Sequence, residues 1–291
     1  MPELPEVETI VRGLDKLLSK KTITKVVFDM SKSFPNSDND LRNFLINSNV
    51  IEVTRRGKVI LIELSNGYSL ITHLKMTGQL IYRSSTKNFG GGHPNDSLIG
   101  NLPDKSTRVT IEFDDFSQLF FNDQRKFGWM RLLPTVEISN IDFFKKLGPE
   151  PLSDSFSWLD LFNRLQKRSK SSIKPVLLDQ SIIAGIGNIY ADESLWMSKI
   201  HPATKVNQLS RPKIKQLYSN IREVLNYSIE KGGSTDRNYR NAEGMKGSYL
   251  DFANVFRKDG LPCNRCGTII VKFKLFGRGT HICPKEQRLV I

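Results

Sequence analysis

The hydrophobic pattern of this chain changes its period twice, and these changes limit the fold more than any other feature. Apolar residues recur at helical spacing over residues 5–19. From there to residue 134 the pattern breaks into short β-rich segments, and Asn66-Gly67 between two of them is a strong hairpin signal. Beyond residue 153 the apolar spacing is helical again. We therefore expect an α+β chain: an antiparallel β-sandwich or barrel with a leading helix, then a helical domain. The predicted strands are TITKVVFDM, NVIEVTRR, KVILIEL, YSLITHL, TRVTIEF, SQLFFND and GWMRLLP.

Composition suggests where the domains meet. The segment LGPEPLSD at 147–154 is typical of a linker. Residues 84–104 are rich in Gly, Ser, Asn and Pro, so we expect a long mobile loop between strands there. The expected domains are a β-sandwich at 1–134, a linker at 135–152, a helical domain at 153–262 and a terminal hairpin at 263–291.

The charge of the chain favours a polyanionic partner. Lys and Arg number 43 against 30 Asp and Glu, a formal net charge of +13. Neutralised phosphates release condensed counterions, so such an excess suits nucleic acid, although a merely soluble basic protein can carry it too. No apolar run approaches about 20 residues, so we expect no membrane span. The acidic N-terminus lacks a secretory signal, and we expect an intracellular protein.

Three cysteines lie near the C-terminus with the spacing C-x2-C-x16-C-x2-E. An odd number does not make a disulfide framework, whereas two C-x2-C pairs at this separation would indicate zinc. Here the last position is Glu286; a carboxylate can bind zinc, and His281 is the other candidate. We expect one structural zinc on Cys263, Cys266, Cys283 and Glu286, because Glu286 stands where the second C-x2-C pair would have its last cysteine; His281 is the alternative fourth ligand. The alternative is a metal-free hairpin with three reduced thiols.

Two further segments are distinctive by themselves. The start, MPELPEVETI, holds two prolines and three glutamates. Pro5 suits the first turn of a helix, and Glu6 and Glu8 suit its positive end.

In AGIGNIYADESLW a Gly-rich turn precedes Asn188 at the start of a helix. Such a turn is a generic binding site for phosphate. A plain turn between helices would have the same appearance.

Taken together, these motifs resemble the formamidopyrimidine-DNA glycosylase family, bacterial-type repair enzymes for oxidised purines. The resemblance implies an N-terminal β-sandwich with a leading helix, a helix–two-turn–helix domain and a zinc-finger hairpin. It also implies a monomeric enzyme of the cytoplasm, associated with the nucleoid, that acts on double-stranded DNA containing oxidised bases or abasic sites. The motifs, in the family's order, are PELPEVET, RRGK, HLKMTGQL, DQRKFG, LGPEPL, AGIGNIYADE, GGSTDRNY and GRGTHICP.

The resemblance implies a bifunctional glycosylase and abasic-site lyase with its nucleophile at the N-terminus. In the family Met1 is removed and the Pro2 amine forms a Schiff base with the sugar, which expels the base and permits strand cleavage by β,δ-elimination. Glu3 corresponds to the proton shuttle and Glu6 to a neighbour that orients the site. Lys58 corresponds to a lysine near the phosphates that also takes part in the later elimination.

Other positions match residues that hold DNA in the family. Met76, Arg125 and Phe127 match the wedge that fills the hole left by an extruded base. Asn188 and Arg278 match the clamp on the phosphates around the extruded nucleotide.

Further expectations follow from the same resemblance. Lys174 matches a family lysine near the damaged base. Where family members often carry histidines before a strand, this chain has KSTRV, and Arg108 is the candidate phosphate contact there. The segment STDRNYRNAEGMKGS corresponds to the loop over the everted lesion and contributes Thr235, Arg237 and Tyr239.

Two alternatives use the same residues. The endonuclease VIII type of enzyme, which favours oxidised pyrimidines, shares the Pro2–Glu3 start; PELPEVET and DQRKFG favour the purine branch instead. A non-catalytic sensor of lesions or abasic sites would have the same scaffold. The presence of Pro2, Glu3 and Lys58 argues against a sensor.

Overall fold

The computed structural model describes residues 1–234 and 248–289, and its chain divides into two compact units. The first unit ends its main segment at Lys145, inside the predicted linker. None of the helices in the described ranges combines the length and apolar character that a membrane span requires. The units are Met1–Lys145 with Lys231–Gly247, and Lys146–Glu230 with Ser248–Ile291.

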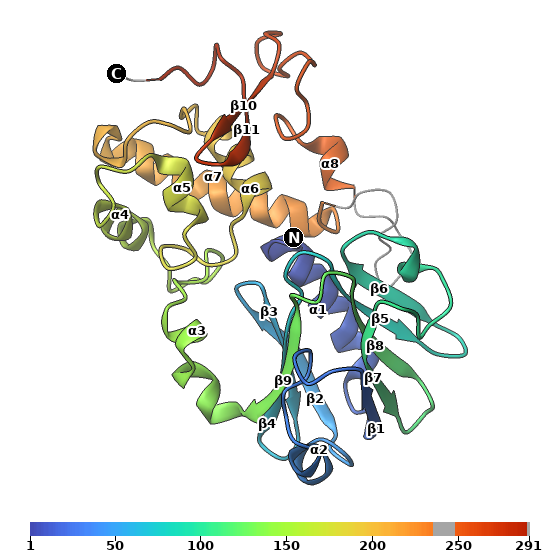
Figure 1. The fold of residues 1–291 in the computed structure, drawn as a ribbon. Helices are drawn as coiled ribbons and strands as arrows, with labels where there is room; N and C mark the ends of the chain where they lie inside the picture. The colour runs from blue at the N-terminus through green and yellow to red at the C-terminus, as the bar shows by residue number, and fades with distance from the viewer. Residues whose placement is uncertain (235–247, 290–291) are drawn as a thin grey trace. The chain divides into compact units, whose positions relative to one another are not determined.

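Two antiparallel sheets form the first unit (Figure 1). Their strands are β1 Ile23–Phe28, β2 Val50–Arg56, β3 Val59–Leu64, β4 Tyr68–His73, β5 Gly78–Arg83, β6 Asn88–Gly92, β7 Thr107–Phe113, β8 Gln118–Asp123 and β9 Trp129–Pro134. A five-stranded sheet has the order β1-β7-β8-β5-β6, and a four-stranded sheet has the order β2-β3-β4-β9. Asn66-Gly67 lies in the turn between β3 and β4, as predicted, and Gly67 has a φ of 80°, which favours glycine.

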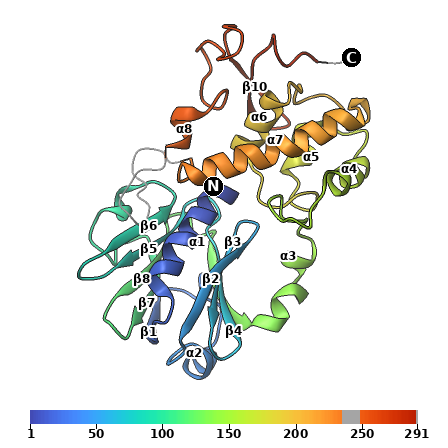
Figure 2. The same ribbon diagram turned by 180° about the vertical axis from the view of Figure 1, so that it is seen from behind.

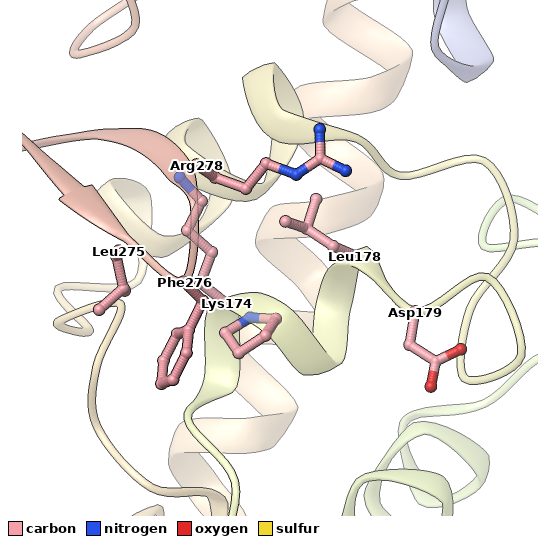
Figure 3. Close-up of a pocket in the computed structure, with 7 residues that line it drawn as sticks. Lys174, Leu178, Asp179, Leu275, Phe276 and Arg278 are labelled. Atoms are coloured by element: carbon pink, nitrogen blue, oxygen red, sulfur yellow. The ribbon is translucent and has the colours of Figure 1, made fainter. Parts of the chain in front are cut away.

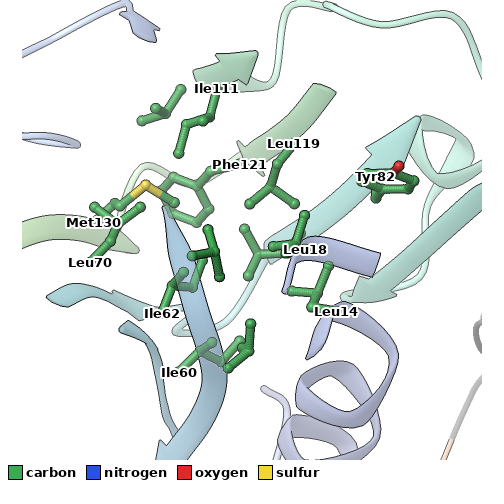
Figure 4. Packing of buried hydrophobic residues seen from close by; sticks show 14 of the residues in the cluster. Leu14, Leu18, Ile60, Ile62, Leu70, Tyr82, Ile111, Leu119, Phe121 and Met130 are labelled. Carbon is green, nitrogen blue, oxygen red and sulfur yellow. The ribbon is translucent and has the colours of Figure 1, made fainter. Parts of the chain in front are cut away.

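Helix α1 (Leu4–Leu18) completes the core of this unit. It packs against β2, at the edge of the four-stranded sheet, and against β6, at the edge of the five-stranded sheet. Leu14 and Leu18 of the helix lie in one cluster with Ile60 of one sheet and Phe121 of the other (Figure 4). Each buried side chain of this size contributes about 1.5–3 kcal/mol, so the helix is firmly anchored between the two sheets.

Residues 84–104 differ from the loop that the sequence predicts. Strand β6 lies within them and pairs with β5, and a short 3-10 helix follows at Asp96–Leu98. Phe89 of β6 is buried against α1, where Gly13 leaves room: a Cβ at Gly13 would lie 2.5 Å from the Phe89 ring. The prediction is therefore wrong for residues 88–92, because tertiary packing of an aromatic side chain overrides a Gly-rich composition.

Helices dominate the second unit. Helix α7 spans 20 residues, and α4 and α6 both pack against it (Figure 2). Helix α4 begins with a capping box, in which the side chains of Ser157 and Asp160 each bond the other's backbone N–H. The helices are α4 Trp158–Gln166, α5 Ile173–Leu178, α6 Asn188–Met197, α7 Arg211–Glu230 and α8 Tyr249–Phe252, while α2 Asp38–Phe44 and α3 Asp142–Lys145 belong to the first unit.

A hairpin of β10 (Val271–Leu275) and β11 (Arg278–Ile282) lies near the C-terminus. Phe276 and Gly277 form its two-residue turn, with φ of 46° and 76°, the left-handed pair that a type I′ turn requires. Helix α6 packs against β11. The predicted multidomain α+β fold class is thus confirmed: sheets with a leading helix, a helical domain and a terminal hairpin.

Candidate active site and metal centre

The N-terminal residues lead directly into helix α1. Glu3 is its N-cap and forms a capping box with Glu6, since the Glu3 N–H donates to Glu6 Oε2 at 2.8 Å and the Glu6 N–H donates to the Glu3 carboxylate. Burial lowers the pKa of the Met1 amine. The carboxylates of Glu3 and Glu6 act to raise that pKa, and Lys58 acts to lower it. The N-terminal amine therefore lies close enough to two carboxylates and a lysine for their charges to affect its pKa.

Glu6 also holds the segment that follows α7. Its Oε1 accepts hydrogen bonds from the Ser234 N–H at 2.6 Å and from the Ser234 hydroxyl at 2.7 Å. Gly233 permits this approach, because its φ is 81° and a Cβ there would lie 3.2 Å from Glu6 Oε1. Ser234 is the first residue of the predicted lesion loop and is described by the structure. The predicted site residues of that loop, Thr235, Arg237 and Tyr239, lie outside the described residues.

Lys58 approaches this environment from the turn between β2 and β3. Gly57 in that turn has a φ of 58°, and Lys58 is 7% exposed.

His73, at the end of β4, is buried as well. Burial, and then the positive charges of Lys75 and Lys58, lower the pKa of His73 to about 3, so the ring is neutral at pH 7. Sequence reasoning missed His73 as a candidate, although it opens the quoted motif HLKMTGQL.

Met76, Arg125 and Phe127 come together on the surface of the first unit. Arg125 Nη1 lies 3.4 Å from the Met76 sulfur, and the guanidinium lies over the Phe127 ring, 4.8 Å from its centroid. Met76 is 45% exposed and Phe127 is 49% exposed. Large apolar side chains held half exposed beside a cation are suited to insertion between bases, unlike side chains buried in a core.

Asp123 supports the turns that carry these three residues. Its carboxylate accepts from the N–H groups of Arg125 at 3.2 Å and Gly128 at 2.6 Å, and also from the Thr77 hydroxyl. Because Thr77 follows Met76 in the chain, one carboxylate holds both turns. Sequence reasoning missed this role; an aspartate at the start of a turn, as in DQRKFG, is the signal for it.

Arg108 lies inside the first unit and is 6% exposed. Its Nε donates to the Asp123 carbonyl at 3.0 Å, and its other nitrogens bond the Asp29 carboxylate and the Lys105 carbonyl. The guanidinium is therefore directed at partners within the protein. This placement argues against the predicted phosphate contact.

In the second unit Lys174, Asn188 and Arg278 gather at the hairpin turn. Asn188 Nδ2 and Lys174 Nζ both donate to the Gly279 carbonyl, at 3.0 and 3.1 Å. Arg278, the neighbour of Gly279, is exposed and lines, with Lys174, a pocket of about 200 Å³ (Figure 3). The structure thus brings an amide and two cations together beside the first turn of α6, where backbone N–H groups also favour an anion.

A buried ion pair lies behind this cluster. Lys174 Nζ is 2.6 Å from Asp192 Oδ1, and their side chains are 1% and 0% exposed. Asp192 Oδ2 accepts the His281 N–H at 3.0 Å and so connects α6 to β11. The Lys174 ammonium is therefore held inside the protein, and its place near a damaged base stays a prediction. Sequence reasoning missed Asp192, although it lies in the quoted motif AGIGNIYADE.

Three cysteine sulfurs form the candidate metal centre. The sulfurs of Cys263, Cys266 and Cys283 all lie within 4.8 Å of one another. The backbone N–H groups of Lys285 and Glu286 bond the Cys283 sulfur, and hydrogen bonds of this kind stabilise a metal-bound thiolate. Three clustered thiols with such support fit zinc, which prefers thiolate ligands.

The two candidates for the fourth ligand have other partners. The Glu286 carboxylate lies 3.0 Å from Lys199 and 3.9 Å from Arg265. His281 faces aspartate carboxylates through both ring nitrogens, at 3.2 and 3.4 Å. Within the part of the chain that the structure describes, neither side chain belongs to the group of three sulfurs.

Three protein-family models together match most of the chain. The first match is to the formamidopyrimidine-DNA glycosylase N-terminal domain, at residues 1–130. The second is to the formamidopyrimidine-DNA glycosylase H2TH domain, at residues 147–239. The third is to the zinc finger found in FPG and IleRS, at residues 260–285, and it includes the three cysteines. The predicted zinc-binding hairpin is thereby confirmed as a zinc-finger domain.

Individual relatives match this chain over nearly its full length. A formamidopyrimidine-DNA glycosylase from Lactiplantibacillus plantarum is 41% identical over 289 residues, covering 99% of this chain and 100% of the relative. A complex of Lactococcus lactis Fpg with abasic-site DNA has a TM-score of 0.86 at 35% identity, covering 98% of this chain and 99% of that one. A structure of MutM with DNA containing carbocyclic 8-oxo-G has a TM-score of 0.85 at 35% identity, covering 99% and 100%. This chain belongs to the formamidopyrimidine-DNA glycosylase family.

Proposed function

We propose that this protein is a bifunctional DNA glycosylase and abasic-site lyase that removes oxidised purines, such as 8-oxoguanine and formamidopyrimidines, from duplex DNA. Similar proteins carry the glycosylase name, and similar structures contain abasic-site DNA or an 8-oxoguanine analogue. The observation that carries the proposal is the capping box of Glu3 and Glu6 at the very start of the chain, with Lys58 close enough to affect the terminal amine.

The proposed reaction begins with removal of Met1, which frees the Pro2 secondary amine. Its lone pair forms a bond to C1′ of the nucleotide, the bond from C1′ to the base breaks, and the base leaves with a proton. Glu3 is suited to carry protons between the amine, the sugar and the base. Opening of the sugar gives an iminium ion that acidifies the C2′ hydrogens, so successive β- and δ-eliminations expel the two phosphates. Lys58 assists the elimination.

The remaining candidates hold the DNA in this proposal. Met76 and Phe127 fill the space left in the base stack, and Arg125 hydrogen-bonds the orphaned base. Asn188 and Arg278 bind phosphates around the extruded nucleotide. Zinc, when bound to the three cysteines, stabilises the hairpin that carries Arg278. The partner is double-stranded DNA, and we expect a monomer that acts in the cytoplasm, at the nucleoid.

Borohydride trapping tests this proposal. The protein lacking Met1 is expected to form a covalent adduct at Pro2 with abasic and 8-oxoguanine duplexes. Pro2→Gly should keep some DNA binding and lose most base excision, whereas Glu52→Gln, at an exposed position of β2, should match the wild type.

The contrary outcomes point to different alternatives. Faster excision from oxidised-pyrimidine duplexes would favour the endonuclease VIII type of enzyme. Binding to abasic DNA without any adduct would favour a sensor. A main adduct on Lys58 would overturn the assignment of Pro2.

A further inference from the structure

Glu286 occupies the position at which a second C-x2-C pair would have its last cysteine. The backbone there keeps the form of a metal-binding turn: the N–H groups of Lys285 and Glu286 bond the Cys283 sulfur, and the Gln287 N–H donates to the Cys283 carbonyl at 2.9 Å. A donor as short as a cysteine at this position would therefore face the other sulfurs.

Side-chain length and charge direct Glu286 elsewhere. A cysteine sulfur is one bond from Cβ, whereas a glutamate oxygen is three bonds away, so from the same backbone the carboxylate can reach partners that lie beyond the place of a thiolate. The Glu286 carboxylate lies 3.0 Å from the Lys199 ammonium, with Arg265 at 3.9 Å. Arg265 is itself fixed, because its guanidinium lies 3.8 Å from the Trp196 ring centroid and donates to the Trp196 carbonyl at 2.9 Å.

We propose that Glu286 does not bind the metal and that the zinc site has three protein ligands, with a fourth position open to a ligand from solution. Among the described residues, the donors gathered for an ion are the sulfurs of Cys263, Cys266 and Cys283. Structural zinc sites are usually closed by four protein ligands, whereas sites with three keep a position for water or a small molecule. The fourth ligand is then water or a borderline-to-soft donor such as imidazole or a thiol. Glu286 instead balances the charges of Lys199 and Arg265.

Cobalt(II) in place of zinc tests this directly, because its visible absorption reports the ligands around it. Full-length protein is loaded with one equivalent of cobalt(II) and titrated with imidazole. The spectra of wild type and Glu286→Gln are expected to coincide without imidazole and to shift together when it is added. Glu286→Cys supplies a fourth thiolate, so its spectrum should not respond to imidazole. Its zinc affinity, measured by competition with a chromophoric chelator, should be tighter by about 10-fold or more.

Lys285→Gln is the matched control, because it changes a charge in the same turn at an exposed position, and it should behave as the wild type. A Glu286→Gln spectrum that differs from wild type before imidazole is added would overturn the proposal, since it would make Glu286 a ligand. A wild-type spectrum that imidazole leaves unchanged would overturn it too. These readouts need neither DNA nor catalysis, so they are independent of the proposed reaction.

Discussion

Glu3 has two roles at the scale of a single residue, because it caps helix α1 and is also the proposed carrier of protons. Glu3→Gln keeps an oxygen that can accept the Glu6 N–H but cannot exchange a proton. We expect the excision rate to fall by roughly 10²–10⁴ in single-turnover kinetics on an 8-oxoguanine duplex. Duplex affinity and thermal stability should change little, since the cap is kept. Near wild-type turnover, equal to that of Glu52→Gln, would remove Glu3 from the mechanism.

His73 makes the unfolding free energy of the first unit depend on pH. Its pKa falls from 6.5 to about 3 in the folded protein, so between these values the unfolded chain binds a proton that the folded chain does not. The stability it contributes is complete above pH 6.5 and is lost as the pH falls toward 3, by about 1.4 kcal/mol per pH unit. Urea denaturation should therefore show that the difference in unfolding free energy between wild type and His73→Gln shrinks by about 2 kcal/mol from pH 7 to pH 5. A difference that stays constant with pH would contradict this assignment.

At the scale of secondary-structure elements, the Lys174–Asp192 pair connects α5 to α6, and Asp192 extends the connection to β11. Lys174→Met leaves a buried carboxylate without its counter-ion, and we expect a loss of about 3–5 kcal/mol in the unfolding free energy. Binding to abasic DNA should weaken as well, because the hairpin that carries Arg278 loses support. Lys170→Met, at an exposed position, is the control. Equal unfolding free energies for the two variants would show that the pair stabilises nothing.

The elements that the sequence predicts are those with a clear local period. All seven predicted strands are present, and α1, α4 and α7 follow from their apolar spacing. Strands β5 and β6 were missed for a physical reason. Both depend on pairing with each other, and β5 also pairs with β8, about 40 residues further along the chain. Local composition, with three glycines in β6, does not reveal such long-range pairing.

At the scale of the whole molecule, the net charge of +13 predicts binding that falls steeply with salt. Each phosphate neutralised by a cation adds about 0.9 to the slope of log affinity against log salt. Arg278→Gln should therefore lower the affinity for abasic DNA and reduce the slope by about 1. Asn188→Ala removes a neutral donor and should lower the affinity with the slope unchanged. Fluorescence anisotropy over a salt series measures both, and equal slopes for wild type and Arg278→Gln would exclude a phosphate contact.

The candidate site was predictable where short motifs identify residues, and less so where burial decides their partners. Sequence motifs single out Met76, Arg125 and Phe127, which the structure brings together. They do not reveal that Arg108 is buried, or that Asp123 supports both wedge turns, because those bonds join segments far apart in the chain. Buried polar partners are selected by the tertiary structure as a whole.

The close approach of Gly13 to Phe89 has a consequence for evolution. The ring leaves no space for a Cβ on that face of α1, so the two positions constrain each other. A relative without the β6 strand would be free to carry a larger residue at the position of Gly13, whereas a relative with it would not. The two positions should therefore covary across the family, and a small residue in the first helix should mark the members in which this segment is folded onto it.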